Sequence, residues 1–289
     1  MNPAGWPAPA KLNLFLHVLG RRADGYHEIQ TAFQLVDLCD SLGFAPRADG
    51  AIRRVDGPAA VVEESDLCLR AARRLKEESG VRQGADLYLR KRIPVEGGLG
   101  GGSSDAATTL VALNEIWGLR WSPARLARIG ADLGADVPLF IRGRSAWGEG
   151  IGERLTSLRL PERHFAIVYP GVGVPTAGVF QAIELTRNSP KTTIRGFLKA
   201  GGRNDCEPIV AGRHPEVARA VRWLAARGTA RLTGTGSCVF AGFAERGQAE
   251  AALAGLPPEW SGFVARGLDR SPLQERLAAE RKSRVGGKV

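Results

Sequence analysis

Five glycines stand close together in the run PVEGGLGGGSSDAATT, between residues 94 and 109: Gly97, Gly98, Gly100, Gly101 and Gly102. Because glycine has no Cβ, a segment rich in it can turn several backbone N–H groups toward one point. If a helix begins there, the positive end of its dipole adds to these donors and favours an anion such as phosphate. We therefore predict a phosphate or nucleotide site, with a flexible turn as the alternative.

The residues around these glycines exclude three common motifs. Ser103 stands where a Walker A sequence needs lysine, and no strict GxGxxG dinucleotide motif fits the segment. Asp105 stands where a nucleophile elbow needs glycine. Ser103 and Ser104 are expected to cap the helix, to supply further hydrogen-bond donors, or both.

Polar residues beside two apolar runs are further candidates for chemistry. Lys11 and Asn13 share one face of the strand expected over residues 12–19. A lysine at the start of a strand is usually a surface residue whose charged end reaches solvent. Asp136 directly precedes an apolar segment, where an acid is often a turn or cap residue; as a general base it would need a hydroxyl within reach.

Two glycine turns complete the set of candidates. The turn at residues 20–27 ends in Tyr26 and His27, which could form a flat site for a planar base, although the residue types alone favour a plain hairpin. Residues 234–237, Gly-Thr-Gly-Ser, form either a plain hairpin or a backbone wall that faces the first glycine segment.

Apolar periodicity predicts the elements that must position these residues. We expect strands at residues 12–19, 85–93, 164–169, 230–233 and 238–243, a further strand after Asp136, and helices at residues 66–78, 104–117, 122–133, 179–185, 215–227 and 248–253. A change of composition at residues 148–163 indicates two domains, residues 1–155 and 156–289. The basic segment 274–289 is expected to end in a frayed tail.

Composition predicts a globular protein of the cytoplasm. The chain has 289 residues, 44% of them hydrophobic, which is enough for a substantial core. Its four cysteines are far apart, and no apolar run approaches the roughly 20 residues of a membrane helix. The formal charge of +10 would suit a nucleic-acid binder, but the arginines are scattered among acids. We therefore expect no nucleic-acid or membrane partner, and an attraction for small anions.

Three segments, PAKLNLFLHVLGRRADGYHEI, PVEGGLGGGSSDAATTLVALN and LTGTGSCVFAGF, resemble in their order and spacing the GHMP family of small-molecule kinases. The family is named after galactokinase, homoserine, mevalonate and phosphomevalonate kinases. The resemblance spans nearly the whole chain. It implies a two-domain α/β fold of the α+β type, with the active site in the cleft between the domains.

The resemblance also implies an activity: transfer of a phosphoryl group from ATP to a small molecule, a sugar alcohol linked to cytidine diphosphate. Mg²⁺ is the expected partner of ATP, with no metal ligand assigned and Ser104 as a candidate. Asp136 matches the catalytic base, and Lys11 matches the lysine that pairs with it. A monomer or a weak homodimer is expected.

The ligand sites follow from the same resemblance. ATP would contact Lys91, Gly97, Gly98, Leu99, Gly100, Gly101, Gly102, Ser103 and Ser104, with Lys91 near the adenine. The acceptor would contact Asn13, Tyr26, His27, Ile151, Thr176 and Phe180. In this assignment Tyr26 stacks on the cytosine, His27 hydrogen-bonds to it and Phe180 closes its other side.

Two positions depart from the family pattern. Glu96 replaces a small residue early in the glycine segment, and we expect it to point to solvent because a carboxylate would repel triphosphate. Asp66 replaces an asparagine, which removes an amide donor from the expected adenine contact. Two alternatives stay open: a family kinase for another acceptor, which would not need the base site at Tyr26 and His27, and a nucleotide-binding protein without catalysis.

Overall fold

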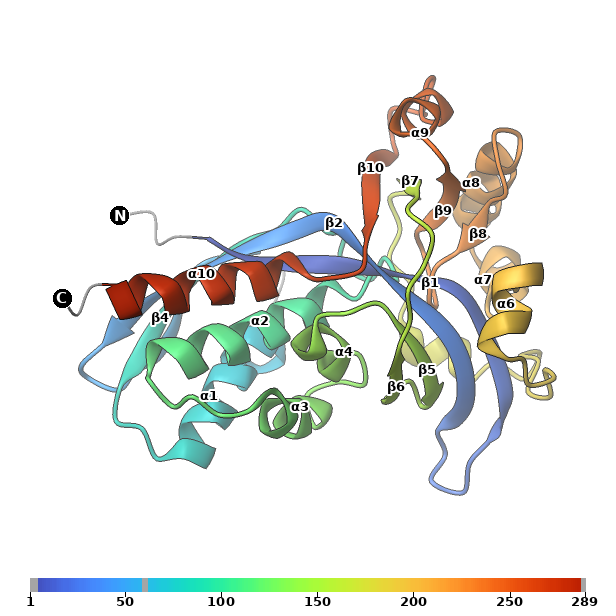
Figure 1. Cartoon of the computed structure of the whole chain (residues 1–289). Helices are drawn as coiled ribbons and strands as arrows, with labels where there is room; N and C mark the ends of the chain where they lie inside the picture. The colour runs from blue at the N-terminus through green and yellow to red at the C-terminus, as the bar shows by residue number, and fades with distance from the viewer. Residues whose placement is uncertain (1–4, 59–61, 287–289) are drawn as a thin grey trace.

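A long antiparallel hairpin runs through the whole molecule (Figure 1). The computed structural model describes residues 5–58 and 62–286. The hairpin consists of β1 (Trp6–Arg21) and β2 (His27–Arg47), joined by a turn in which the backbone N–H of Arg22 donates to Tyr26 O. β1 is longer than the strand predicted over residues 12–19. Both strands are buried along most of their length, because elements of both halves of the chain pack against them.

The first half of the chain covers one end of this hairpin with helices (Figure 1). β4 (Gly84–Arg90) pairs with β2, and β3 (Ile52–Asp56) pairs with β4. β5 (Ala146–Gly150) also pairs with β2, and β6 (Arg154–Ser157) pairs with β5. The helices here are η1 (Glu63–Ser65), α1 (Leu67–Ser79), α2 (Gly101–Ile116), α3 (Pro123–Ala131) and α4 (Val137–Arg142). Their apolar faces and one face of the sheet share a large core.

The second half forms a smaller layered unit at the other end. Its strands lie in the order β10 (Ser261–Leu268), β7 (His164–Tyr169), β9 (Val239–Phe243) and β8 (Arg231–Leu232). Its helices are α5 (Thr176–Phe180), α6 (Ile194–Ala200), α7 (Glu207–Arg213), α8 (Pro215–Ala225) and α9 (Arg246–Ala252). Since β10 pairs with both β7 and β2, all the strands join in one sheet of mixed pairing, as expected for the predicted class.

The basic C-terminal segment is helical over most of its length, and the frayed end that we predicted falls on residues 287–289, outside the described residues. Residues 272–286 form α10 (Pro272–Gly286), which lies along the first half of the molecule and contacts β1 and α2 (Figure 1). Leu273 is fully buried in the large core, and Leu277, four residues later, packs against the same core. Arg281 is paired with Glu115 on α2. With only these two apolar residues among many charged ones, the segment has too little apolar periodicity for a helix to be predicted from its sequence.

Two other elements differ from the prediction. The segment after Asp136 is helix α4 rather than a strand, with a proline in its first turn and Gly143 in the left-handed conformation at its end. The helix predicted at residues 179–185 is displaced to α5, and the residues after it form turns. No helix within residues 5–58 and 62–286 has the length and apolar character needed to cross a membrane.

Candidate active site

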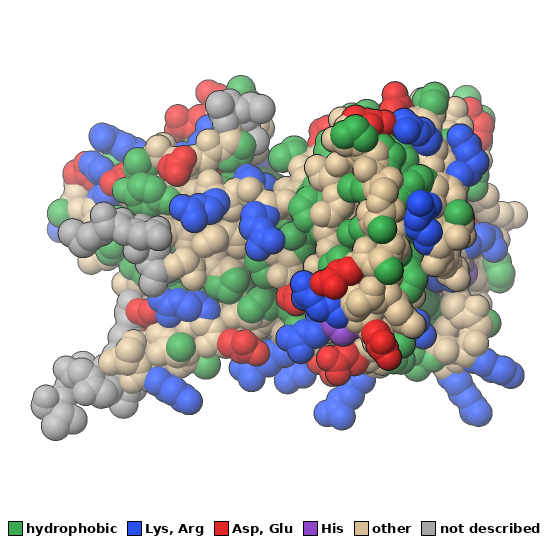
Figure 2. Space-filling view, turned by 90° about the horizontal axis from the view of Figure 1, so that it is seen from above, with side chains coloured by type: hydrophobic (Ala, Val, Ile, Leu, Met, Phe, Trp, Pro, Cys, Tyr) green, Lys and Arg blue, Asp and Glu red, His purple; other side chains and the backbone are tan. Residues whose placement is uncertain are grey.

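A cavity of about 640 Å³ lies where the two halves meet, and Figure 2 shows a hollow between the two lobes of the surface. From the first half, its walls include the glycine segment 97–102, Lys11 and Asp136. From the second half they include Thr176, Phe180 and Thr235. The cavity therefore brings together candidates that lie far apart in the sequence.

The glycine segment joins β4 to α2, so the predicted order of strand, loop and helix is confirmed. Helix α2, however, begins at Gly101 rather than at Ser104, and the left-handed Gly100 (φ 72°) stands at its N-cap position with no side-chain cap. Serine capping was therefore wrong. The first bond of the helix runs from Ser104 N to Gly100 O. The amides of residues 101–103 precede that bond and are the donors that a helix start leaves unpaired.

Gly98 and Gly100 are held in place by close neighbours. Both have positive φ, at 75° and 72°. A Cβ on Gly98 would lie 2.2 Å from Thr233 O and 3.0 Å from Gly236 N. The Gly-Thr-Gly-Ser segment 234–237 is therefore a backbone wall against the glycine segment, one of the two alternatives that the sequence left open.

The two serines differ in their surroundings. Ser103 lines the cavity. Ser104 does not; it is completely buried, and its hydroxyl has no hydrogen-bond partner among the described residues. No group of three or more His, Cys, Asp or Glu side chains that could hold a metal ion occurs within residues 5–58 and 62–286.

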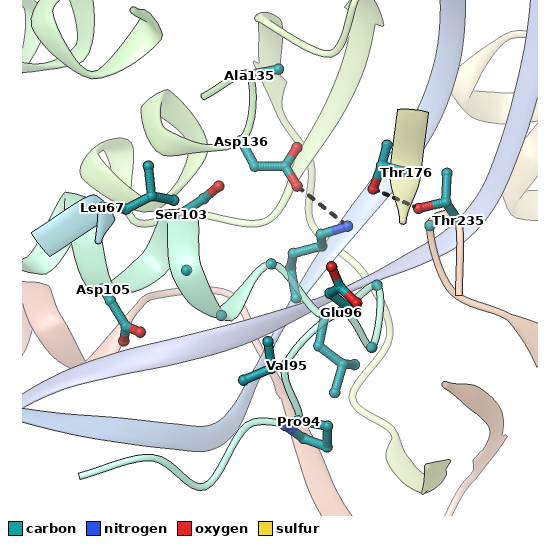
Figure 3. Close-up of a pocket in the computed structure, with 18 of the residues that line it drawn as sticks. Leu67, Pro94, Val95, Glu96, Ser103, Asp105, Ala135, Asp136, Thr176 and Thr235 are labelled. Atoms are coloured by element: carbon teal, nitrogen blue, oxygen red, sulfur yellow. Dashed lines mark hydrogen bonds and ion pairs between the residues drawn. The ribbon is translucent and has the colours of Figure 1, made fainter. Parts of the chain in front are cut away.

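Lys11 and Asp136 both line the cavity, and the dashed line from Asp136 in Figure 3 marks the ion pair between them. Lys11 Nζ lies 3.4 Å from Asp136 Oδ2, and Lys11 is 4% exposed. Asp136 stands at the N-cap position of α4 but makes no cap hydrogen bond, so its carboxylate is left to face the lysine. The backbone N–H of Lys11 donates to Leu99 O at 2.9 Å. β1 thus fixes the position of the ammonium group relative to the glycine segment.

Asn13 supports this pair from the same face of β1, as its spacing from Lys11 predicted. Its Oδ1 accepts from Lys11 Nζ at 2.5 Å, and its Nδ2 donates to Thr31 Oγ1. The backbone N–H of Asn13 donates to Thr233 Oγ1. One asparagine thereby connects the lysine to β2 and to the second half of the molecule.

Lys91 also lines the cavity, where its ammonium group contacts two buried carboxyl groups. Its ammonium group contacts Asp40 Oδ2 at 2.5 Å and Asp105 Oδ2 at 2.8 Å. Burial raises the pKa of Asp105 to about 8, against the opposing effect of Lys91. Asp40 also accepts from the backbone N–H groups of Arg92 and Ile93, which fixes the entry to the glycine segment. The sequence reasoning selected neither aspartate as a site residue, because only the folded chain brings Asp40 and Asp105 to the same lysine.

The structure shows the contacts of Asp66 and Glu96, the two residues that depart from the family pattern. Asp66 caps α1: its Oδ1 accepts from the amides of Cys68 and Leu69, and its Oδ2 is paired with Arg54 at 2.8 Å. Asp66, like Lys91, lines the cavity. Glu96 is exposed, with φ 53°, and its carboxylate lies close to Gly173. It also lines the cavity (Figure 3), so the expectation that it points away from the phosphate site is not confirmed.

The expected acceptor residues come from both halves of the chain. Asn13, Ile151, Thr176 and Phe180 line the cavity, whereas Tyr26 and His27 do not. Tyr26 is 62% exposed. His27 is at the limit of burial, and its ring stacks on that of Phe180 with centroids 5.4 Å apart. The Thr176 and Thr235 hydroxyls are 2.9 Å apart (Figure 3), so Thr235 is a further cavity residue that the sequence reasoning did not select.

A glycine-rich helix start beside a lysine–carboxylate pair, in a cleft between two α/β units, defines a phosphotransferase. The chain belongs to the GHMP kinase family. The description "GHMP kinases N terminal domain" matches residues 66–144, and "GHMP kinases C terminal" matches residues 182–261. The family and the fold class that the sequence predicted are thus confirmed.

Similar proteins within the family are named 4-diphosphocytidyl-2-C-methyl-D-erythritol kinase. The one from Halorhodospira halophila is 53% identical over 94% of this chain and 96% of its own length. The one from Alkalilimnicola ehrlichii is 54% identical over 96% of both chains. A crystal structure of 4-(cytidine 5'-diphospho)-2C-methyl-D-erythritol kinase superposes with a TM-score of 0.80 at 34% identity, covering 90% of this chain and 98% of that chain.

Proposed function

We propose that this protein transfers the γ-phosphoryl group of ATP to the 2-hydroxyl of 4-diphosphocytidyl-2-C-methyl-D-erythritol, a step of the methylerythritol phosphate route to isoprenoid precursors. The observation that carries the proposal is the Lys11–Asp136 pair beside the glycine segment, in a chain whose relatives of that name match it nearly from end to end. The same pair argues against a binding protein without catalysis.

ATP binds with its phosphates on the glycine segment. The backbone N–H groups of residues 97–103 and the dipole of α2 supply positive potential there, as at other helix starts that hold phosphate. The base lies toward Leu67 and Lys91, at the end of the cavity that Asp66 also lines. A Mg²⁺ ion bound with the triphosphate would neutralise part of its charge. The Ser104 hydroxyl, the candidate that the resemblance offered as a ligand, is completely buried and does not line the cavity, so we assign no protein oxygen to this ion.

The acceptor is held across the cleft. Tyr26, His27 and Phe180 surround the cytosine, whereas Asn13, Ile151 and Thr176 contact the rest of the molecule. Because Phe180 both lines the cavity and stacks on His27, it connects the base site to the reaction centre.

The reaction places little covalent demand on the protein and a large demand on positioning. Asp136 accepts the proton of the 2-hydroxyl while that oxygen attacks the γ-phosphorus in line. The new O–P bond forms as the bond from phosphorus to the β–γ bridging oxygen breaks, and ADP leaves. Lys11 stabilises the negative charge that develops on the attacking oxygen, at a fixed distance from the base.

ADP release tests this function. Purified protein is mixed with Mg-ATP and either 4-diphosphocytidyl-2-C-methyl-D-erythritol, mevalonate or homoserine. We expect turnover with the first acceptor alone. Turnover with mevalonate or homoserine instead would assign the chain to another activity of the family. ATP binding without turnover on any acceptor would favour the non-catalytic alternative.

We further propose that the protein works in the cytoplasm as a monomer or weak homodimer, without a nucleic-acid or membrane partner. The four cysteines are free, which suits a reducing compartment. On the face shown in Figure 2, Asp and Glu side chains are mixed with Lys and Arg side chains on both lobes, although Lys and Arg predominate along the lower edge. Binding to DNA with a steep dependence on salt would contradict this proposal.

A further inference from the structure

Arg187 is the centre of a hydrogen-bond network at the base site. Its Nε donates to His27 Nε2 at 3.0 Å. Its two terminal nitrogens donate to four backbone carbonyls, those of Phe180, Ala182, Ile183 and Leu185, at distances between 2.6 and 3.3 Å. One half-buried guanidinium group therefore connects the start of β2 to the segment that follows α5.

This network explains the shape of that segment. The sequence predicted a helix over residues 179–185, but α5 ends at Phe180. Beyond it, carbonyl groups turn toward Arg187 and accept its N–H groups. The same arrangement holds the Phe180 ring against His27, with an angle of 26° between the ring planes.

The contact also determines which nitrogen of His27 carries a proton. Arginine stays protonated and has donors but no acceptor. An Nε2 that accepts from Arg187 must therefore carry a lone pair, which places the proton of a neutral imidazole on Nδ1. Burial, Arg187 and Arg21 all lower the pKa of His27, so the ring is neutral at pH 7. Within the described residues, no hydrogen bond engages Nδ1.

We propose that Arg187 is a positioning residue that gives the site its preference for cytosine, by fixing His27 as an Nδ1–H donor toward the base. Cytosine N3 is an acceptor and can pair with this donor. In uracil the same position is N–H, which would face the His27 N–H with neither group paired. A site built around one donor rejects a ligand that leaves it unpaired. The inference rests on the proposed function in placing cytosine beside His27.

Binding of CDP and UDP, measured by calorimetry, tests the inference without turnover. Wild-type protein is expected to bind CDP more tightly than UDP by about tenfold or more. In Arg187→Met, CDP binding should weaken and the ratio should fall toward one, while the affinity for ATP stays within about twofold, because the glycine segment is untouched. An unchanged ratio in a folded variant would overturn the proposal.

Arg213→Met is the matched control. Arg213 donates to Gly178 O and is paired with Glu184, so it holds the same segment without contacting His27. Its loss should leave the ratio of CDP to UDP affinity as in the wild type. An equal loss of preference in both variants would mean that packing of the segment, and not the histidine proton, sets the selectivity.

The tautomer can be measured directly in wild-type protein by ¹⁵N NMR of labelled histidine. We expect His27 with Nδ1 protonated and Nε2 bare, and a shift toward a mixture of tautomers in Arg187→Met. A proton on Nε2 in the wild type would refute the inference even if the variant failed to fold. If the tautomer and the CDP preference are as expected but no acceptor is phosphorylated, the proposed function fails while the role of Arg187 stands.

Discussion

Replacing Asp136 with asparagine separates its chemical role from its structural one. The substitution keeps the size of the side chain and an oxygen near Lys11, but removes the group that accepts the proton. General base catalysis contributes about 10²- to 10⁴-fold, or about 3 to 5 kcal/mol, and we expect kcat to fall by that factor. The KM for ATP should change little, because the glycine segment does not depend on this carboxylate.

The cost to stability should be much smaller. Asp136 keeps 26% of its side chain exposed, and Lys11 retains Asn13 Oδ1 as a hydrogen-bond partner. We expect a loss of about 1 kcal/mol in the free energy of unfolding, in the range of partly exposed ion pairs. The loss in turnover therefore exceeds the loss in stability, and unfolding of the variant cannot account for it.

ADP release and urea denaturation measure the two effects on the same sample. Asp132→Asn is the control, since Asp132 is an exposed acid four residues earlier, 3.8 Å from Arg74 and remote from Lys11. It should match the wild type in kcat. A near-normal kcat in Asp136→Asn would remove this residue from the mechanism. A comparable loss of kcat in both variants would mean that the change in net charge, and not the loss of a base, causes the effect.

Three further predictions follow from the site. Tyr26→Ala should raise the KM of the acceptor while leaving that of ATP and the stability nearly unchanged, because Tyr26 is 62% exposed; an equal rise for ATP in steady-state assays would place the pyrimidine elsewhere. Gly98→Ala should weaken ATP binding, as measured by calorimetry, and lower the free energy of unfolding by about 1 kcal/mol or more, because its Cβ would lie 2.2 Å from Thr233 O. Gly247→Ala is the control and should change neither quantity, because its Cβ would meet open space. In the folded protein Asp105 keeps its proton up to about pH 8, whereas the unfolded chain releases it near pH 4, so the contribution of Asp105 to stability falls as the pH rises from 4 to 8. In Asp105→Asn, urea denaturation should show a smaller decline in the free energy of unfolding over this pH range. Parallel pH profiles for the variant and the wild type would contradict this prediction.

Much of the site could be predicted because its parts are local. The glycine segment, the placing of Lys11 and Asn13 on one strand face, and the turn before His27 depend on neighbours in sequence, where backbone sterics and the alternation of a strand act. These patterns located the phosphate loop and indicated the family. Strand β7 was predicted with the bounds that the structure shows.

Elements that depend on distant partners were the ones that failed. Strands β5, β6 and β10 are short or mixed in polarity and are defined by their pairing: β5 with β2, β6 with β5, and β10 with β7 and β2. Helix α10 exists because Leu273 has a core to enter. The sequence of a single segment does not show which surface it will pack against, so apolar periodicity alone misses elements of this kind.

The sequence by itself determined which residues could do chemistry, because residue type and local backbone freedom are properties of the chain. It could not determine that Lys91 would lie between two carboxylates, or that Arg187 would meet His27 across the base site. Those contacts join residues up to 160 positions apart. The tertiary structure decided them, because the protonation and orientation of a buried polar group depend on the partners that folding brings to it.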